Sequence, residues 1–221
     1  MDNNYTLLSS PMQKDMPLFR GGEPMVIRQV RSIESGDSCN TAVVSVFNHA
    51  GTHVDVPNHF YKDGKAITDY SINDFIFNSP LVIECPKNDD ELISIDDLKT
   101  LKQCDILLLK TGFAQHRNDV KRYSEHNPGL SPEAADHIRK NYPGIRAIGI
   151  DAISIAAATK SPEGRKTHQI LLNPEKGRPV FIIEDMYISD DLHEVSSVYV
   201  IPFFIEGIDS SPCTVFGEVR L

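Results

Sequence analysis

The chain has 221 residues, of which 40% are hydrophobic and 24% are charged, and its formal net charge is -9. A chain of this length fits one domain with a single core, which we expect to span residues 1–221. Because the charge is negative and no basic run stands out, nucleic acid is not expected as a partner.

The N-terminal part predicts little regular structure before two strands. Residues 1–24 are rich in proline, glycine and polar side chains, and they predict an irregular segment with a turn at 19–24. No basic segment followed by an apolar core is present, so we expect no signal peptide. Residues 25–30 and 41–47 then alternate or run apolar, as strands do.

A dense histidine cluster follows. Residues 47–60 contain three of the eight histidines of the chain, His49, His53 and His59, with Asp55 between the second and the third. Imidazole nitrogen and carboxylate oxygen together suit Zn²⁺, Mn²⁺ or Fe²⁺. Without a metal, each polar group left unsatisfied in such a cluster would cost roughly 1–3 kcal/mol. The cluster therefore predicts a metal site.

The spacing within this cluster predicts a loop followed by a strand. His49 and His53 are four residues apart, as on a helix face, but Gly51 and its β-branched neighbours disfavour a helix. In an extended chain His53 and Asp55 point to one side, where they can meet one ion, while Val54 turns into the core. The freedom of Gly51 lets the preceding loop bring His49 to the same ion.

The middle of the chain mixes helices with a larger share of strands. We predict strands at 81–85, 105–111 and 145–151, a short helix at 94–102, and a helix that Ser131 caps, Pro132 begins and Pro143 ends. The pattern alone indicates an α/β or α+β fold in which β structure predominates.

Later segments carry three further predictions. Residues 160–166 are polar and contain proline and glycine, which predicts a mobile surface loop. Asp151 ends a predicted strand and is interpreted as the cap of the next turn, with a carboxylate of the pocket wall as the alternative. The longest strongly apolar run, 198–205, contains Pro202 and is far too short to span a membrane, so we expect a cytoplasmic protein.

His168 and Glu184 each lie beside an apolar run. His168 precedes residues 170–172, and Glu184 ends the run 180–183. A carboxylate at the end of a buried strand must be solvated, paired or bound to a metal, because burial of a bare charge is costly. The residues alone leave these three possibilities open.

The remaining histidines and the cysteines are interpreted as unrelated to chemistry. Polar surroundings predict surface positions for His116, His126, His137 and His193 and a solvated turn at Asp190 and Asp191. The widely spaced Cys39, Cys85, Cys104 and Cys213 are interpreted as reduced thiols.

The pattern His49-x-Gly51-Thr52-His53-x-Asp55-x-Pro57-x-His59 resembles the signature of the metal-dependent cyclase-like hydrolases, which include bacterial kynurenine formamidases and isatin hydrolases. It fixes seven of eleven positions. The likeness extends through Gly112-Phe113, Gly149-Ile150-Asp151, His168, Glu184 and a Gly-x-Asp-x-x-Pro ending at 207–212. It implies the swivelling β/β/α fold and a homo-oligomer, either a dimer or a tetramer.

The resemblance also implies a complete centre. It places a histidine and a glutamate beside the metal, so the expected ligands are His49, His53, Asp55, His168 and Glu184. One or two divalent ions are expected, with Zn²⁺ first and Mn²⁺ as the alternative. His59, set at the rim by Pro57, is the expected catalytic residue that moves a proton between water and the leaving amine.

Such a centre suits hydrolysis of an amide, because a bound metal lowers the pKa of water from 15.7 to about 7. The resemblance implies an arylformamidase that converts N-formyl-L-kynurenine to L-kynurenine and formate. Family formamidases carry a Trp-Pro-Gly-Asp-like turn, whereas this chain has no tryptophan and has Phe19 and Arg20 in the corresponding turn. An isatin-hydrolase-like cyclic amidase, a cyclase or dehydratase, and a metal-stabilised binding protein remain the alternatives.

Overall fold

The computed structural model describes residues 4–189, 192 and 195–219. The predicted surface position of His193 and the predicted turn at Asp190 and Asp191 lie outside these residues.

A mixed sheet of nine strands forms the centre of the described chain. Its strands are β1 (Asn4–Leu7), β4 (His53–Asp55), β5 (Ile76–Phe77), β6 (Pro80–Glu84), β8 (Ile106–Lys110), β10 (Ala147–Ile150), β11 (Phe181–Glu184), β12 (Val195–Pro202) and β13 (Ser210–Val219). Their order is β5-β12-β13-β4-β11-β10-β8-β6, and β1 pairs with β13. Strands β6, β8, β10 and β11 run parallel, whereas β4 lies antiparallel between β11 and β13.

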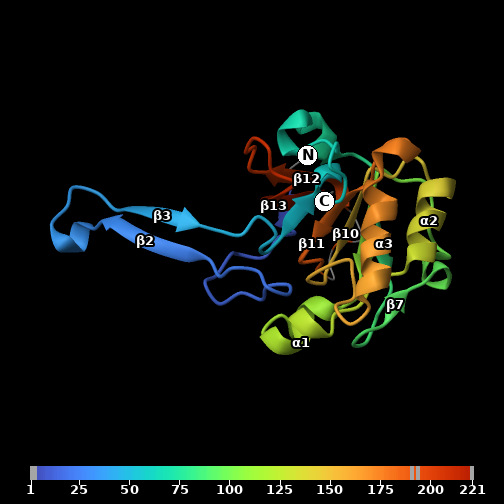
Figure 1. Ribbon diagram of the computed structural model, residues 1–221, viewed down its shortest axis with the longest axis horizontal. Coiled ribbons are helices and arrows are strands. Elements are labelled where there is room, and N and C mark those ends of the chain that lie inside the picture. The colour runs from blue at the N-terminus through green and yellow to red at the C-terminus, as the bar shows by residue number, and fades with distance from the viewer. Residues whose placement is uncertain (1–3, 190–191, 193–194, 220–221) are drawn as a thin grey trace.

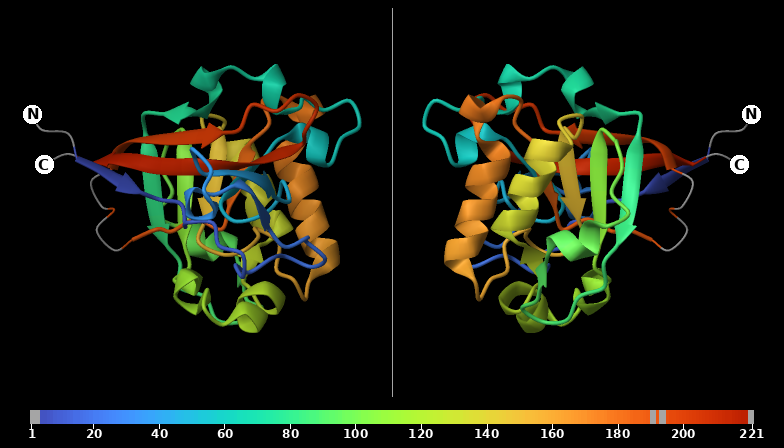
Figure 2. Two further views of the ribbon diagram at one scale, coloured as in Figure 1. Left: turned by 90° about the vertical axis from the view of Figure 1, so that its left-hand side faces the viewer. Right: turned by 90° about the vertical axis from the view of Figure 1, so that its right-hand side faces the viewer.

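Helices α2 and α3 cover one face of the parallel strands, and α1 lies apart from them (Figures 1 and 2). The α-helices are α1 (Val120–Glu125), α2 (Pro132–Asn141) and α3 (Ser161–Leu172). Short 3₁₀ helices lie at Ile33–Ser35, Pro57–His59, Ile67–Asp69, Ile72–Phe75, Ile95–Leu98, Phe113–His116 and Pro174–Lys176, and β7 (Leu92–Ile93) pairs with β9 (Gly129–Leu130). In the part of the chain that the structure describes, no helix is long and apolar enough to cross a membrane.

Alternating side chains of the central strands build two cores. Leu107 and Leu109 of β8 face the helices and pack in one cluster with Leu171 of α3. Ile106 and Leu108 face the other way and pack in a second cluster with residues of β12 and β13. The layers are therefore β/β/α, which confirms the strand-rich α/β fold and the swivelling arrangement expected from the sequence.

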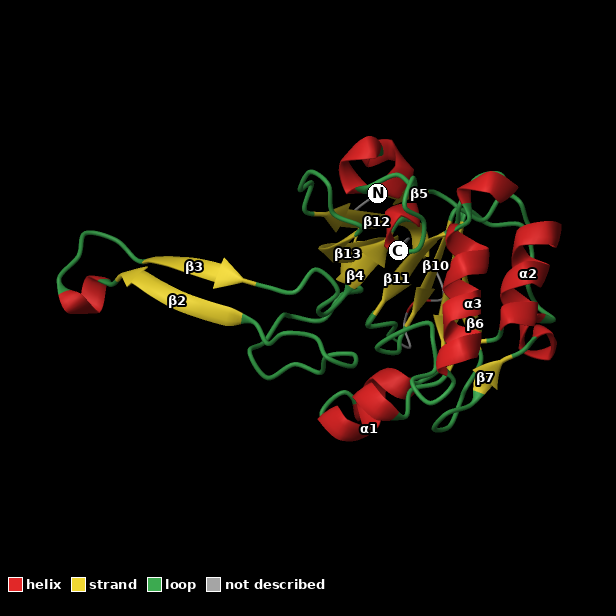
Figure 3. Ribbon diagram, in the orientation of Figure 1, coloured by secondary structure: helices red, strands yellow, loops and turns green. Residues whose placement is uncertain are grey.

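A hairpin projects away from this body (Figures 1 and 3). Its strands, β2 (Val26–Arg31) and β3 (Thr41–Ser45), confirm the two strands predicted before the histidine cluster. Every residue of both strands is exposed, including the apolar side chains of Val26, Ile27, Val30, Val43 and Val44. We call residues 26–45 the arm.

The prediction of an irregular segment over 1–24 is wrong at Asn4–Leu7. These residues form β1 and pair antiparallel with the C-terminal strand β13. The partner lies more than 200 positions away in the sequence, so local patterns carry no trace of it. The interleaving of both ends of the chain in one sheet supports one domain over residues 1–221, which stays a prediction.

The prediction of a mobile loop over 160–166 is also wrong, because these residues open α3. Pro162 lies in the first turn of the helix, where its missing N–H needs no partner. Gly164 is required by packing, since a Cβ there would come within 2.3 Å of the Ala156 Cβ. The two residues that suggested a loop are thus a normal helix start and a close contact between the helix and the loop at Ala156.

Candidate metal centre

The strand β4 presents two of the predicted ligands to one side. His53 and Asp55 are 3% and 1% exposed, and Val54 between them is fully buried in the core. The neighbouring strand β11 sets Glu184 directly opposite His53 in the register. His53 Nε2 consequently lies 3.3 Å from Glu184 Oε2 and 3.7 Å from Asp55 Oδ1.

The loop before β4 brings His49 over the same carboxylate, as the sequence predicted. Gly51 has a φ of +64°, a left-handed conformation that turns the loop and that glycine adopts without strain. His49 Nδ1 thereby lies 3.1 Å from Asp55 Oδ1.

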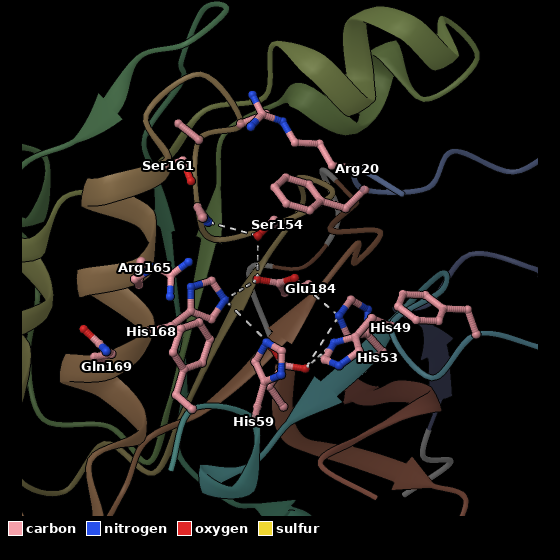
Figure 4. Close-up of a pocket in the computed structure, with 17 residues that line it drawn as sticks. Arg20, His49, His53, His59, Ser154, Ser161, Arg165, His168, Gln169 and Glu184 are labelled. Carbon is pink, nitrogen blue, oxygen red and sulfur yellow. Dashed lines mark hydrogen bonds and ion pairs between the residues drawn. The ribbon is translucent and has the colours of Figure 1, made fainter. Parts of the chain in front are cut away.

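Helix α3 supplies a further imidazole from the opposite wall (Figure 4). His168 Nε2 lies 3.3 Å from Glu184 Oε1 and 3.9 Å from Asp55 Oδ2. Glu184 is fixed from behind, because its Oε1 accepts hydrogen bonds from the Ser154 hydroxyl at 2.9 Å and the Ile155 N–H at 2.7 Å. The five predicted ligands thus converge, although they come from three separate parts of the chain.

The orientation of two imidazoles is fixed by backbone carbonyls. Nδ1 of His53 lies 2.8 Å from the Gly51 oxygen, and Nδ1 of His168 lies 2.9 Å from the Gly164 oxygen. Since a carbonyl only accepts, both Nδ1 atoms carry a proton and both Nε2 atoms face the carboxylates. This is the support that metal-ligating histidines usually have.

His59 lies at the edge of the cluster, where the turn at Pro57–His59 follows β4. Its Nε2 lies 4.0 Å from Asp55 Oδ2, and its Nδ1 lies 2.7 Å from Asp209 Oδ2. Asp209 also lies 3.0 Å from His49 Nε2 and accepts a hydrogen bond from the Asn48 amide. The sequence did not assign Asp209 to the site, although it belongs to the Gly-x-Asp-x-x-Pro ending that carried part of the resemblance.

The electrostatics of the cluster favour positive charge at its centre. Burial alone would lower the pKa of His49, but the neighbouring carboxylates of Asp209 and Asp55 outweigh it and raise that pKa to about 10. For Glu184, burial would raise the pKa, yet the ion pairs with the imidazoles of His168 and His53 hold it well below its usual value. The carboxylates therefore attract either protons on the imidazoles or a cation in their place.

The residues fit a divalent cation. Nε2 of His53 and both carboxylate oxygens of Asp55 are buried, yet none of them has a hydrogen-bond partner. An unsatisfied buried carboxylate is costly, and a metal ion would satisfy all three atoms. Ligand atoms of two groups, His49-Asp55-His59 and His53-Asp55-Glu184, lie within 4.8 Å of one another, and Asp55 belongs to both.

The cluster forms the floor of an open pocket of about 580 Å³. Phe19 and Arg20, from the turn that corresponds to the Trp-Pro-Gly-Asp-like turn of the formamidases, line this pocket together with Phe47 and Phe60. The ring of Phe60 stacks on His168 with 5.0 Å between the ring centroids. The described histidines outside the cluster, His116, His126 and His137, do not line it.

Asp151 has a structural role. Its carboxylate accepts hydrogen bonds from the N–H and hydroxyl of Thr111, at 2.7 and 2.6 Å, and from the Gly112 N–H at 2.8 Å. It does not line the pocket. The prediction that it caps the turn after its own strand is wrong, because the turn that it caps follows the neighbouring strand β8.

In a comparison with known proteins, residues 6–157 match the family model Cyclase, which is described as "Putative cyclase". A kynurenine formamidase of Geobacillus thermodenitrificans is 29% identical over 162 residues, which cover 72% of this chain and 73% of the relative. Among solved structures, isatin hydrolase A of Ralstonia solanacearum has a TM-score of 0.85 at 20% identity, covering 99% of this chain and 92% of that chain. A potential metal-dependent hydrolase with cyclase activity has a TM-score of 0.75 at 22% identity and full coverage of both chains.

Proposed function

Since the chain belongs to the Cyclase family, we propose that it is a metal-dependent hydrolase that cleaves an amide C–N bond. One observation carries this proposal. The buried carboxylate of Asp55, without a hydrogen bond, is shared by two groups of ligand atoms on the floor of an open pocket. A structural metal site would be closed, whereas a catalytic one needs an open position.

The proposed ligands are His49, His53, Asp55, His168 and Glu184, which would hold one or two ions. Imidazole and carboxylate ligands accept both Zn²⁺ and Mn²⁺, and we propose Zn²⁺ as the first candidate. When bound, the ion supplies Lewis acidity and lowers the pKa of water from 15.7 to about 7.

The proposed catalytic residue is His59. Of the four imidazoles in the cluster it is the most exposed, with 27% of the side chain accessible. The Asp209 carboxylate accepts a hydrogen bond from the protonated Nδ1 of His59. This leaves Nε2 unprotonated as the base on the side that faces Asp55. His59 Nε2 takes a proton from the attacking water and returns it to the leaving nitrogen, while Asp209 holds the ring in orientation.

For the substrate we propose N-formyl-L-kynurenine, hydrolysed to L-kynurenine and formate in tryptophan catabolism. Similarity to kynurenine formamidases supports this choice. The aromatic rings of Phe19, Phe47 and Phe60 on the pocket walls offer an apolar surface for an aryl group.

Hydrolysis by protein loaded separately with Zn²⁺ and Mn²⁺ tests this proposal. We expect N-formyl-L-kynurenine to be turned over in a metal-dependent manner, with activity lost on chelation and restored by the ion. The panel includes isatin, because preferred opening of its ring would identify a cyclic amidase instead. Bound metal without turnover of a wider set of formamides, lactams and cyclic imides would contradict the hydrolase and favour a metal-stabilised binding protein.

We also propose that the protein is a homo-oligomer and that the arm packs against a second copy. A two-stranded hairpin is marginally stable alone in water, yet the arm leaves Val43 and Val44 47% and 56% exposed. Light scattering coupled to size exclusion should give a dimer or tetramer for the wild type. The double variant Val43→Asp/Val44→Asp should give a monomer that keeps its metal, since the arm lies outside the pocket. A monomeric wild type, or an unchanged variant, would exclude this assembly.

A further inference from the structure

Two arginines line the pocket without a partner. Neither Arg20 nor Arg165 forms a hydrogen bond or an ion pair with any residue that the structure describes. Elsewhere in the described part of the body the guanidinium groups are engaged: Arg117, Arg122, Arg146 and Arg178 pair with carboxylates and Arg139 binds backbone carbonyls. Among the described residues of the body, the unpaired arginines thus lie at the mouth of the candidate active site.

The helix α3 positions Arg165 relative to the metal centre. Ser161, Arg165 and His168 are spaced by four and three residues, so they share one helix face, and all three line the pocket. Figure 4 shows the guanidinium group of Arg165 beside the His168 ring. The face therefore presents a proposed metal ligand at the floor of the pocket and an exposed cation from the preceding turn of the helix.

The surrounding charges leave this cation free to bind an anion. The carboxylates of Asp55 and Glu184 lie on the floor among imidazoles, and a divalent cation would neutralise them. Glu163 is two positions away on the helix but forms no ion pair with Arg165 within the described chain. In a protein of net charge -9, a cationic pocket rim is a local feature that favours a negatively charged ligand.

We propose that the substrate amide carries a carboxylate, which Arg165 binds at the rim while the amide lies at the metal centre. This inference rests on the proposed amide hydrolysis. Arg165 is the principal residue, and Arg20, which also lines a second hollow beside α1, adds positive charge to the pocket. A planar guanidinium group matches the two oxygens of a carboxylate.

The walls between the two subsites define the rest of the ligand. Phe47, Phe60 and the segment 156–158 make them apolar, which suits a flat aryl body. The carboxylate that Arg165 binds is therefore carried on the same aryl body as the amide. The substrate class is accordingly an N-acylated aryl amine that also bears a carboxylate.

Two substrates that differ only in the carboxylate, N-formylanthranilate and formanilide, test the proposal with metal-loaded protein. We expect kcat/KM for N-formylanthranilate to exceed that for formanilide by about tenfold or more. Arg165→Met should raise KM for N-formylanthranilate about tenfold and leave KM for formanilide unchanged. A tenfold change is at the low end of the effect of a charge-assisted hydrogen bond, because Arg165 is exposed. Arg165→Lys should restore part of the loss. Lys166→Met is the matched control, since it removes an exposed charge outside the pocket and should change neither substrate.

Calorimetry with unreactive ligands separates this inference from the proposed activity. Benzoate should bind the metal-loaded wild type about tenfold more tightly than it binds Arg165→Met, and benzamide should not distinguish them. Benzoate binding that depends on Arg165, without turnover of either formamide, would sustain the anion subsite and refute the activity. Equal turnover of both formamides, with benzoate affinity unaffected in Arg165→Met, would refute the subsite and leave the activity standing.

Discussion

Asp55→Asn should yield a folded protein that no longer retains metal. The Asp55 carboxylate belongs to both groups of candidate ligands and lies within 4.0 Å of all four imidazoles of the cluster. Loss of an outer partner of a metal ligand already costs about 10–100-fold in affinity, so loss of a shared ligand should cost more than about 100-fold. Metal content measured by mass spectrometry after dialysis should fall below one ion in ten molecules, with activity falling in proportion.

Asp151→Asn is the matched control for this variant. Both aspartates are 1% exposed, but Asp151 caps the turn at Thr111 and Gly112 and does not line the pocket. Its replacement should lower the melting temperature, because backbone N–H groups lose a charged acceptor, and should leave the metal content intact. Full metal retention in Asp55→Asn would show that the cluster is not the metal centre.

Local patterns were sufficient for the part of the site that lies in one short segment. The alternation of His53, Val54 and Asp55 predicted that the two polar side chains share one side of a strand while Val54 enters the core, and the structure confirms that arrangement. The same holds for Gly51, whose positive φ brings His49 back over Asp55. Such features depend on backbone geometry within a few residues, and this geometry can be read from spacing.

Features that depend on distant packing were not accessible in this way. Nothing local marked Asp209 as a partner of His59, because the two meet only through strand pairing across 150 positions. The helix character of α3 was hidden by Pro162 and Gly164, whose places are set by the helix start and by contact with Ala156. Tertiary context overrides propensity at such positions. Consequently the position of Arg165 at the pocket could not be predicted from the sequence.

The histidines of the cluster differ in burial and in the carboxylate that each one contacts. His53 and His168 are 3% and 7% exposed and turn Nε2 toward Glu184, whereas His59 is 27% exposed and is held by Asp209. Deep burial beside a carboxylate suits a fixed ligand, and access to solvent suits a group that exchanges protons. His59 also lies near His49 and Asp55, within one of the two groups that could hold an ion. Its role as base or as ligand is therefore open to a direct experiment.

His59→Ala should reduce kcat by about 10²–10⁴-fold, the usual contribution of general acid–base catalysis, while metal content stays at the wild-type level. Asp209→Asn supplies a companion, because an amide at this position can no longer hold the proton on Nδ1 of His59. The ring is then free to take the wrong tautomer, so kcat should fall in the same direction. Because Asp209 also contacts the proposed ligand His49, metal affinity should fall by about 10–100-fold, and kcat is therefore measured at saturating metal. If His59→Ala instead loses metal together with activity, His59 is a ligand, and the proton must be carried by another group of the pocket.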